Sequence, residues 1–303
     1  MKRSATTVAV LLLALVAGCG TRAAGPTRSK LPDLGAVPTI TEVQQVVRPI
    51  DAYLPTPAQT DRVERAAYLT SVRCLKRFGV AEPSGIAPPP SDPAGRAVRS
   101  QLYGYFAPRA APLAGYDSAV VPQRTTPLPD DALELLTGRD KGGAAVTQYH
   151  GRPVAKGGCW QEGLDAVGGA ALLAGDPAGM PGGGPPEPLK DPRVIDADQQ
   201  WSACMKSRGF SYGTPADAYM DPRWRAPGTA GRTPTHSAAE IKTATADMSC
   251  KRSTNFMGVV VAVESAYDRE YIAANSARLA ALKKGVANHL ATVAEIIAAG
   301  HTA

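Results

Sequence analysis

Five cysteines are spread singly along this 303-residue chain, at positions 19, 74, 159, 204 and 250. From Cys74 onward no two of them lie closer than 45 residues, whereas structural zinc sites use close pairs such as C-x2-C. This spacing argues against a metal site and favours disulfides, which persist only in an oxidising compartment. The fold therefore depends on whether the chain reaches such a compartment.

Residues 1–18 are typical of a bacterial lipoprotein signal peptide. Lys2 and Arg3 form a short positive segment, and an apolar run of about ten residues follows from Val8 to Ala17. This run is too short to span a bilayer, which takes roughly 20 residues. It ends in Leu-Val-Ala-Gly followed by Cys19, which predicts cleavage between Gly18 and Cys19 and lipidation of the Cys19 thiol. An ordinary secretory leader is the alternative.

A lipidated Cys19 implies a location at the outer face of the cell membrane. Two acyl chains on one residue give stable anchoring, so the predicted partner of this end of the chain is the lipid bilayer. Residues 19–40 contain Pro26, Pro32 and Pro38 and few apolar residues, and are predicted to be a flexible tether.

The four remaining cysteines are an even number, as expected for two disulfides. A short internal repeat helps to choose among the three possible pairings: Cys74-Leu75-Lys76 is followed by Gly79, and Cys204-Met205-Lys206 is followed by Gly209. Both segments are typical of helix ends with a Schellman cap at the glycine. A duplicated helical unit predicts pairing within each half, Cys74 with Cys159 and Cys204 with Cys250. Pairings between the halves remain open.

Capping signals predict where helices begin. Thr56-Pro57-Ala58-Gln59 is a capping box with Pro at the first helical position, and apolar residues then recur with helical spacing up to Gly79. A shorter counterpart is predicted from Asp196 to Arg208. Ser237-Ala238-Ala239-Glu240 is a second capping box, and predicts a helix that reaches Cys250.

The longest predicted helix begins at Phe256. Unbroken to Ala298 it would measure about 65 Å at 1.5 Å per residue, more than the width of about 50 Å expected for a compact globule of this size. Lys283-Lys284-Gly285 resembles the end of a helix, so we expect a break at Gly285. A protruding helix packed on another is the alternative.

Composition indicates how these helices are connected. The chain has 30 Gly and 27 Pro and only 6% aromatic residues, and the Gly/Pro-rich segments 81–97, 168–192 and 213–235 are predicted to be loops. The predicted fold is mainly α, with Ala-rich helices joined by long loops and held by two disulfides. The predicted domains are a first helical unit at 41–190 and a second one at 191–303.

Several segments resemble uncharacterised lipoproteins of high-GC actinobacteria. The residues that carry the likeness are Pro49–Tyr53, Gly151–Val154 running into Gly157–Cys159, Trp201–Met205 and Ala246–Lys251. The resemblance implies an envelope location and a four-cysteine mature region. It implies no particular activity.

Charge and motifs exclude several classes of function. The net charge is +6, and no run of Lys and Arg exceeds two residues, which argues against nucleic-acid binding. The four histidines have no metal-ligand spacing, and serine-nucleophile and phosphate-loop motifs are absent from the sequence. We therefore predict no metal and no cofactor.

Carboxylate pairs are the only candidates for catalysis. Glu162 with Asp165, and Glu264 with Asp268, lie at helical spacing. Solvent-exposed helix charges explain such pairs most simply. A cell-wall hydrolase that uses two carboxylates is nevertheless the alternative function.

One short basic and aromatic patch is a candidate binding site. Arg223, Trp224 and Arg225 are consecutive, and could stack on sugar faces or contact anionic wall polymers through their guanidinium groups. A tryptophan that packs on the core is the simpler explanation of the same residues. The leading prediction is a non-catalytic accessory lipoprotein that binds a ligand, a wall polymer or another envelope protein.

Overall fold

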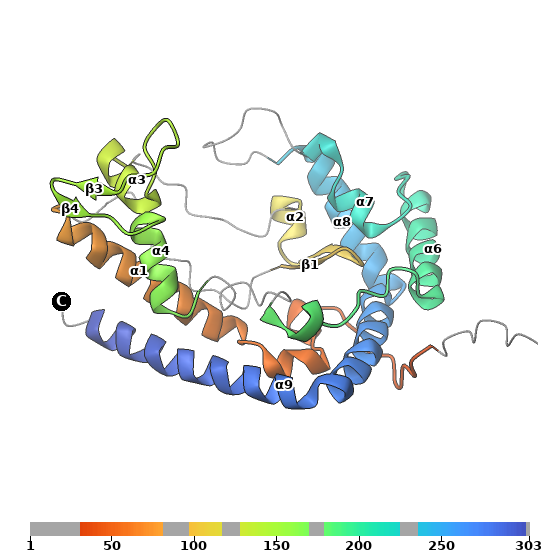
Figure 1. Ribbon diagram of the computed structural model, residues 1–303. Coiled ribbons are helices and arrows are strands. Elements are labelled where there is room, and N and C mark those ends of the chain that lie inside the picture. Colours follow the sequence, from red (N-terminus) through yellow and green to blue (C-terminus); the bar gives the residue numbers. More distant parts are fainter. Residues whose placement is uncertain (1–30, 81–96, 117–127, 170–178, 225–235, 301–303) are drawn as a thin grey trace, which may run out of the picture. The chain divides into compact units, whose positions relative to one another are not determined.

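The computed structural model describes residues 31–80, 97–116, 128–169, 179–224 and 236–300. These residues fold mainly into helices, as predicted (Figure 1). The α-helices are α1 (Pro57–Arg77), α2 (Ala111–Ala114), α3 (Asp130–Thr137), α4 (Gly158–Ala166), α6 (Pro192–Ser207), α7 (Pro215–Tyr219), α8 (Ala238–Ser253) and α9 (Phe256–Gly300). The 3₁₀ helices are η1 (Val43–Gln45), η2 (Pro49–Tyr53), η4 (Pro181–Gly183) and η5 (Pro222–Trp224).

Two antiparallel hairpins contain the β-strands of the described residues, and one isolated antiparallel bridge joins Arg139 to Ala145. Strand β1 (Val98–Ser100) pairs with β2 (Gly104–Phe106) so that Arg99 faces Tyr105. Strand β3 (Gln148–Tyr149) pairs with β4 (Arg152–Pro153). Each hairpin is too short to be stable in isolation. The hairpins therefore depend on the helices that surround them.

The predicted ends of α1 and α6 are confirmed. Thr56 caps α1 by accepting a hydrogen bond from the Gln59 amide, and the Gln59 side chain completes the capping box. At the other end the Val80 amide donates to the Leu75 carbonyl at 3.2 Å. The Phe210 amide donates to Met205 at 3.0 Å in the same way after α6. Both contacts belong to Schellman caps, in which the left-handed conformation is supplied by a glycine.

Both disulfides form within the halves, which confirms the predicted pairing. Cys74 at the end of α1 binds Cys159 in α4, and Cys204 in α6 binds Cys250 in α8. The first bond closes a separation of 85 residues and the second one of 46. In the chain-entropy account, closing loops of this size stabilises a fold by roughly 4 kcal/mol each.

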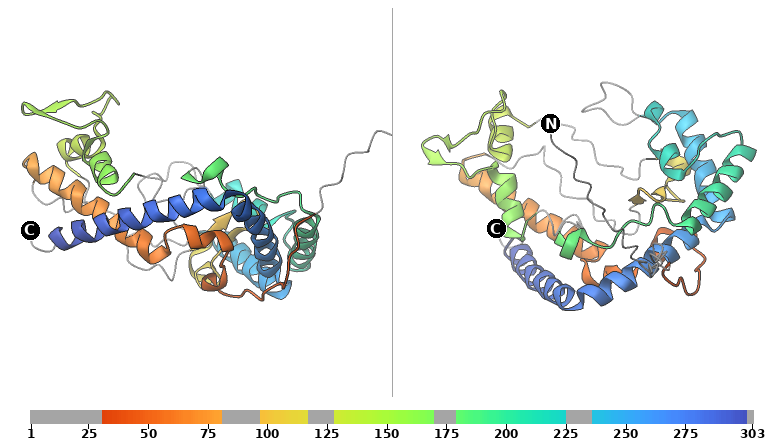
Figure 2. Two further views of the ribbon diagram at one scale, coloured as in Figure 1. Left: turned by 60° about the horizontal axis from the view of Figure 1, so that its bottom comes forward. Right: turned by 45° about the vertical axis from the view of Figure 1, so that its right-hand side comes forward.

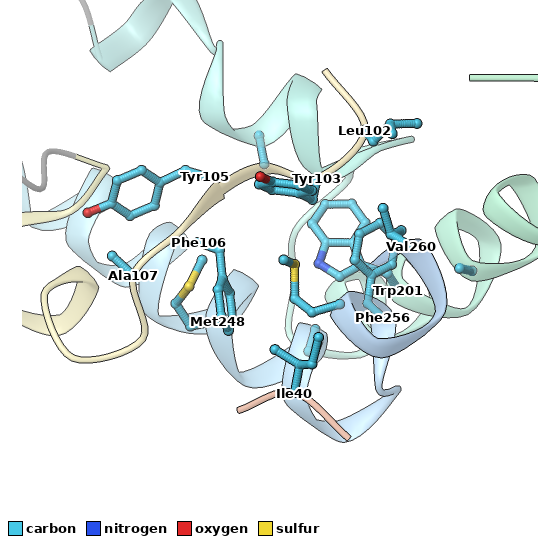
Figure 3. Close-up of a cluster of buried hydrophobic side chains, with 14 of the residues drawn as sticks. Ile40, Leu102, Tyr103, Tyr105, Phe106, Ala107, Trp201, Met248, Phe256 and Val260 are labelled. Atoms are coloured by element: carbon cyan, nitrogen blue, oxygen red, sulfur yellow. The ribbon is translucent and has the colours of Figure 1, made fainter. Parts of the chain in front are cut away.

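The largest core cluster surrounds Trp201 of α6, as Figure 3 shows. Tyr105 and Phe106 of β2 and Phe256 of α9 are fully buried there. Tyr103 to Phe106 therefore pack in the core. This core contains residues from both sides of the predicted boundary at residue 190, so the two predicted units share it.

Three smaller clusters lie elsewhere. One encloses the Cys74–Cys159 disulfide between α1, α3 and α4. A second joins Val63 of α1 to Val293 of α9, and a third joins Ile50 of η2 to Leu279 of α9. Apolar burial in the described residues is thus divided between one main core and three smaller clusters.

The expected break of the last helix at Gly285 is wrong. Helix α9 runs through Gly285, and the only residue with non-helical dihedrals inside it is Asn275, at φ −121° and ψ 16°. The dihedrals mark a kink at Asn275, whose side chain donates to the Tyr271 carbonyl at 3.0 Å. Figure 2 shows the resulting bend of α9. Beyond the bend α9 lies alongside α1 (Figure 2). Helix α9 is longer than the main core, and the part beyond the bend is buried by packing on α1.

Other boundaries differ from the prediction in small ways. Helix α6 begins at Pro192 because Asp191 caps it. The predicted loop 213–235 contains α7, which begins with a capping box formed by Thr214 and Asp217. Ser237 caps α8, but the Glu240 carboxylate accepts from the Tyr116 amide instead of closing a capping box. A tertiary contact has replaced the local one.

Replacing Gly285 of α9 with alanine tests the continuity of this helix. Nothing lies within 4 Å of a Cβ added at Gly285, so Gly285→Ala is expected to raise the free energy of unfolding by about 0.5–1 kcal/mol because alanine favours helix. Gly163→Ala is the matched control: its Cβ would meet the Ala67 carbonyl and the Ser71 hydroxyl, so it should destabilise. Thermal unfolding measures both. A destabilised Gly285→Ala protein would contradict an unbroken α9.

Candidate functional site

The predicted basic patch is described at two of its three positions. Arg223 and Trp224 lie in η5, while Arg225 lies outside the described residues. The Trp224 indole N–H donates to the Ala218 carbonyl at 2.7 Å, and its ring lies 6.3 Å from that of Tyr116. Trp224 is therefore half-buried and packs against the main core.

Arg223 is held over the ring of Trp224. Its guanidinium carbon lies 5.0 Å from the ring centroid. The guanidinium donates to both Asp221 carboxylate oxygens and to the Tyr212 hydroxyl. This contact with Arg223 lowers the pKa of the Asp221 carboxyl below its usual range. Asp221 therefore orients Arg223 and neutralises part of its charge.

The turn after α6 brings two further aromatic side chains to this patch. The left-handed conformation of Gly209 at φ +86° ends the helix, and the Phe210 amide donates back to the Met205 carbonyl. Ser202 donates to the Tyr212 carbonyl at 2.6 Å, and the Tyr212 hydroxyl donates to Asp221 at 2.8 Å. Hydrogen bonds from two elements thus fix the position of this turn.

Together these residues line a pocket of about 470 Å³, which we call the aromatic groove. Its volume lies within the range of small-molecule sites. The α8 residues Ala239, Lys242 and Thr243 form its opposite wall, and its lining contains no carboxylate. The full lining is Gly209, Phe210, Ser211, Tyr212, Arg223, Trp224, Ala239, Lys242 and Thr243.

Only part of the groove was recognisable in the sequence. Arg223 and Trp224 were identified because they are adjacent. Tyr212 and Lys242 are 30 positions apart and belong to no motif. Phe210 belongs to no motif either, and its position in the groove follows from the path of the turn after Gly209.

The candidate carboxylate pairs are engaged in ion pairs and hydrogen bonds. Glu162 pairs with Arg77 at 2.7 Å, and Asp165 accepts from the Gln161 amide. Glu264 and Asp268 are buried, and both bind Arg48, which precedes η2. The expectation of solvent-exposed helix charges is therefore wrong for Glu264 and Asp268.

The Arg48 cluster carries more negative than positive charge. Arg48 donates to Glu264 at 2.8 Å and to Asp268 at 3.0 Å, while the second Glu264 oxygen, Oε2, has no hydrogen-bond partner among the described residues. Burial, opposed by Arg48, raises the pKa of Glu264 to about 7. The neighbouring carboxylates Asp268, Glu187 and Asp51 act in the same direction.

A second buried ion pair lies in the main core. The Lys251 ammonium donates to Asp247 at 2.9 Å and to the Tyr105 carbonyl at 2.6 Å, and the Trp201 indole donates to Asp247 at 2.9 Å. Burial raises the pKa of Asp247 and lowers that of Lys251. The hydrogen-bond partners come from three elements, so the pair connects α6, α8 and β2. We therefore interpret it as a structural ion pair of the core.

Two further features concern all of the described ranges. No group of three or more His, Cys, Asp or Glu side chains there is arranged to hold a metal ion. No helix within those ranges is long and apolar enough to cross a membrane. Gly18 and Cys19, the predicted cleavage and lipidation residues, lie outside them.

Comparison with known proteins adds no further assignment. No protein-family model, no curated protein and no solved structure matches the chain.

Replacing Glu264 tests the raised pKa of its carboxyl. Because the folded-state pKa lies above the unfolded value of about 4.3, the folded chain holds this proton more tightly, and its contribution to stability is lost as pH rises towards 7. Glu264→Gln keeps the neutral form. We expect it to raise the free energy of unfolding at pH 8 by roughly 1–3 kcal/mol and to change it little at pH 5.

Chemical denaturation at the two pH values measures this difference. Glu187→Gln, at an exposed carboxylate beside the same cluster, is the control and should change stability much less at either pH. A Glu264→Gln protein that is less stable than the unmodified chain at pH 8 would show that the Arg48 ion pair outweighs the burial of charge.

Proposed function

We propose that this chain is a lipid-anchored extracytoplasmic protein that acts by binding, and that the aromatic groove binds an anionic saccharide polymer of the cell envelope. The observation that carries the proposal is the composition of the groove. Three aromatic side chains and two cationic ones line it without a carboxylate. Aromatic faces suit the apolar faces of sugar rings, and Arg suits phosphate or carboxylate groups.

The charge of the groove supports an anionic ligand. Lys242 is exposed and has no ion-pair partner among the described residues. Arg223 shares its charge with Asp221 but keeps a side chain that is 68% exposed. An anionic ligand therefore meets one unpaired cation and one oriented guanidinium, both next to aromatic rings.

The alternative of a hydrolase with two carboxylates has less support. Each carboxylate of the two candidate pairs is bound by a side chain of the protein. None of the four residues lines the aromatic groove. The geometry thus favours binding without cleavage.

Lipid anchoring rests on the leader and on Cys19. The two disulfides agree with an oxidising compartment. We expect Cys19→Ala protein to be lost from the membrane fraction, and the mature chain to begin with a blocked, diacylated Cys19. Thr21→Ala is the matched control and should stay in the membrane fraction. Mass spectrometry of the N-terminus decides the question, and an unmodified first residue other than Cys19 would contradict anchoring.

Sedimentation with isolated cell walls tests the groove. The Arg223→Gln/Lys242→Gln double variant is expected to bind intact walls roughly 5- to 10-fold more weakly than the unmodified chain, because it loses both charges that face the ligand. Higher salt should weaken binding of the unmodified chain. Acid-treated walls, stripped of anionic polymers, should retain little protein.

Lys206→Gln provides the control, since Lys206 is an exposed cation of α6 that does not line the groove. It should bind walls as the unmodified chain does. Unchanged binding of the double variant would refute the groove as the site. Release of soluble muropeptides would instead favour the hydrolase.

A further inference from the structure

A second pocket lies between α1, α3 and α4, beside the Cys74–Cys159 disulfide. It has a volume of about 480 Å³, within the range of small-ligand sites. Trp160 of α4 is 49% exposed and Leu133 of α3 is 44% exposed, and both line this pocket. Trp160 is the only aromatic residue among the exposed large apolar residues of the described chain. Exposed apolar side chains that gather at one groove are typical of a ligand-binding site.

The walls of this pocket are held in place from three sides. Cys159, directly before Trp160, is bonded to Cys74 of α1. One turn later Gly163 brings α4 against α1, because a Cβ there would meet the Ala67 carbonyl and the Ser71 hydroxyl. Gly158 contacts the backbone at the end of α3 equally closely. The pocket is therefore preformed, which lowers the entropic cost of binding.

The polar groups of the lining restrict the class of ligand. The Ser71 hydroxyl donates to the Ala67 carbonyl at 3.0 Å, and the Thr137 hydroxyl donates to the Leu133 carbonyl at 2.9 Å. Both hydroxyl protons are thus used within the protein. A saccharide needs many hydrogen-bond partners, and this lining offers few. The remaining surface comes from Tyr68, Leu133, Leu136 and Trp160 and is largely apolar.

Arg139 is the one charged residue in the lining. Its Nη1 donates to the Gly143 carbonyl at 2.8 Å, which positions the side chain. No carboxylate among the described residues pairs with it, and its other guanidinium N–H groups are available to a ligand. An apolar pocket with one cation at its edge matches a ligand with an apolar body and one negative end.

We propose that the pocket between α1, α3 and α4 binds a small amphiphilic anion, with a hydrocarbon chain packed against Trp160 and Leu133 and a carboxylate bound by Arg139. This site is distinct from the aromatic groove in its elements and in its ligand chemistry. The proposal does not depend on the function assigned to that groove.

Quenching of tryptophan fluorescence by 10-bromodecanoate tests the proposal, because bromine quenches an indole that it contacts. We expect saturable quenching of the purified chain below the concentration at which the probe forms micelles. The same quenching is expected for Trp224→Phe, at the aromatic groove, and its loss is expected for Trp160→Phe. Both residues are at least partly exposed, so neither change removes a fully buried ring.

Arg139 is tested with a neutral analogue. Arg139→Gln is expected to weaken binding of 10-bromodecanoate about 3- to 10-fold and to leave binding of 10-bromodecanol unchanged. Saturable quenching that persists in Trp160→Phe, or no saturable quenching of the unmodified chain, would overturn the site. Equal loss for the acid and the alcohol, or no loss for either, would overturn the role of Arg139 in binding the anion.

Discussion

Helix α9 is the element that joins three of the four core clusters of the described residues. It contributes Val260 to the main core, Leu279 to the cluster at η2 and Val293 to the cluster at α1. A helix of 45 residues would measure about 68 Å if it were straight. The bend at Asn275 lets one continuous helix contact three separate clusters. The continuity of α9 therefore links the main core to two smaller clusters that lie outside it.

The parts of the fold that followed from the sequence were those decided by local chemistry. Thr56 with Gln59, and glycines 79 and 209, set helix ends through contacts within a few residues. The disulfide pairing followed from the repeat of such ends. Gly285 failed as a helix end because its cost inside a helix, about 1 kcal/mol, is smaller than the gain from packing Val293 of α9 on Val63 of α1. The residues around Gly285 in the sequence do not reveal the packing of α9 on α1, so this gain in stability could not be predicted from them.

Burial of charge was the other feature that the sequence concealed. Lysine and glutamate are almost never fully buried without a partner, so Lys251 and Glu264 were not expected in the interior. Asp247 lies one helical turn before Lys251 in α8, whereas the Tyr105 carbonyl and Arg48 are brought to these buried groups by the fold. Arg48 lies more than 200 positions before Glu264. No periodicity or motif relates residues at that distance, so only the path of the chain brings them together.

The two disulfides do more than restrict the unfolded chain, since each lies in helices that build one of the two pockets. The disulfide between α1 and α4 fixes the residue next to Trp160. The disulfide between α6 and α8 joins two helices that flank the aromatic groove: α6 leads into the turn with Phe210 and Tyr212, and α8 carries Lys242. A thin core gives little stiffness of its own. Covalent links at these positions supply the rigidity that preformed sites require, so reduction should weaken ligand binding at both pockets before it unfolds α9.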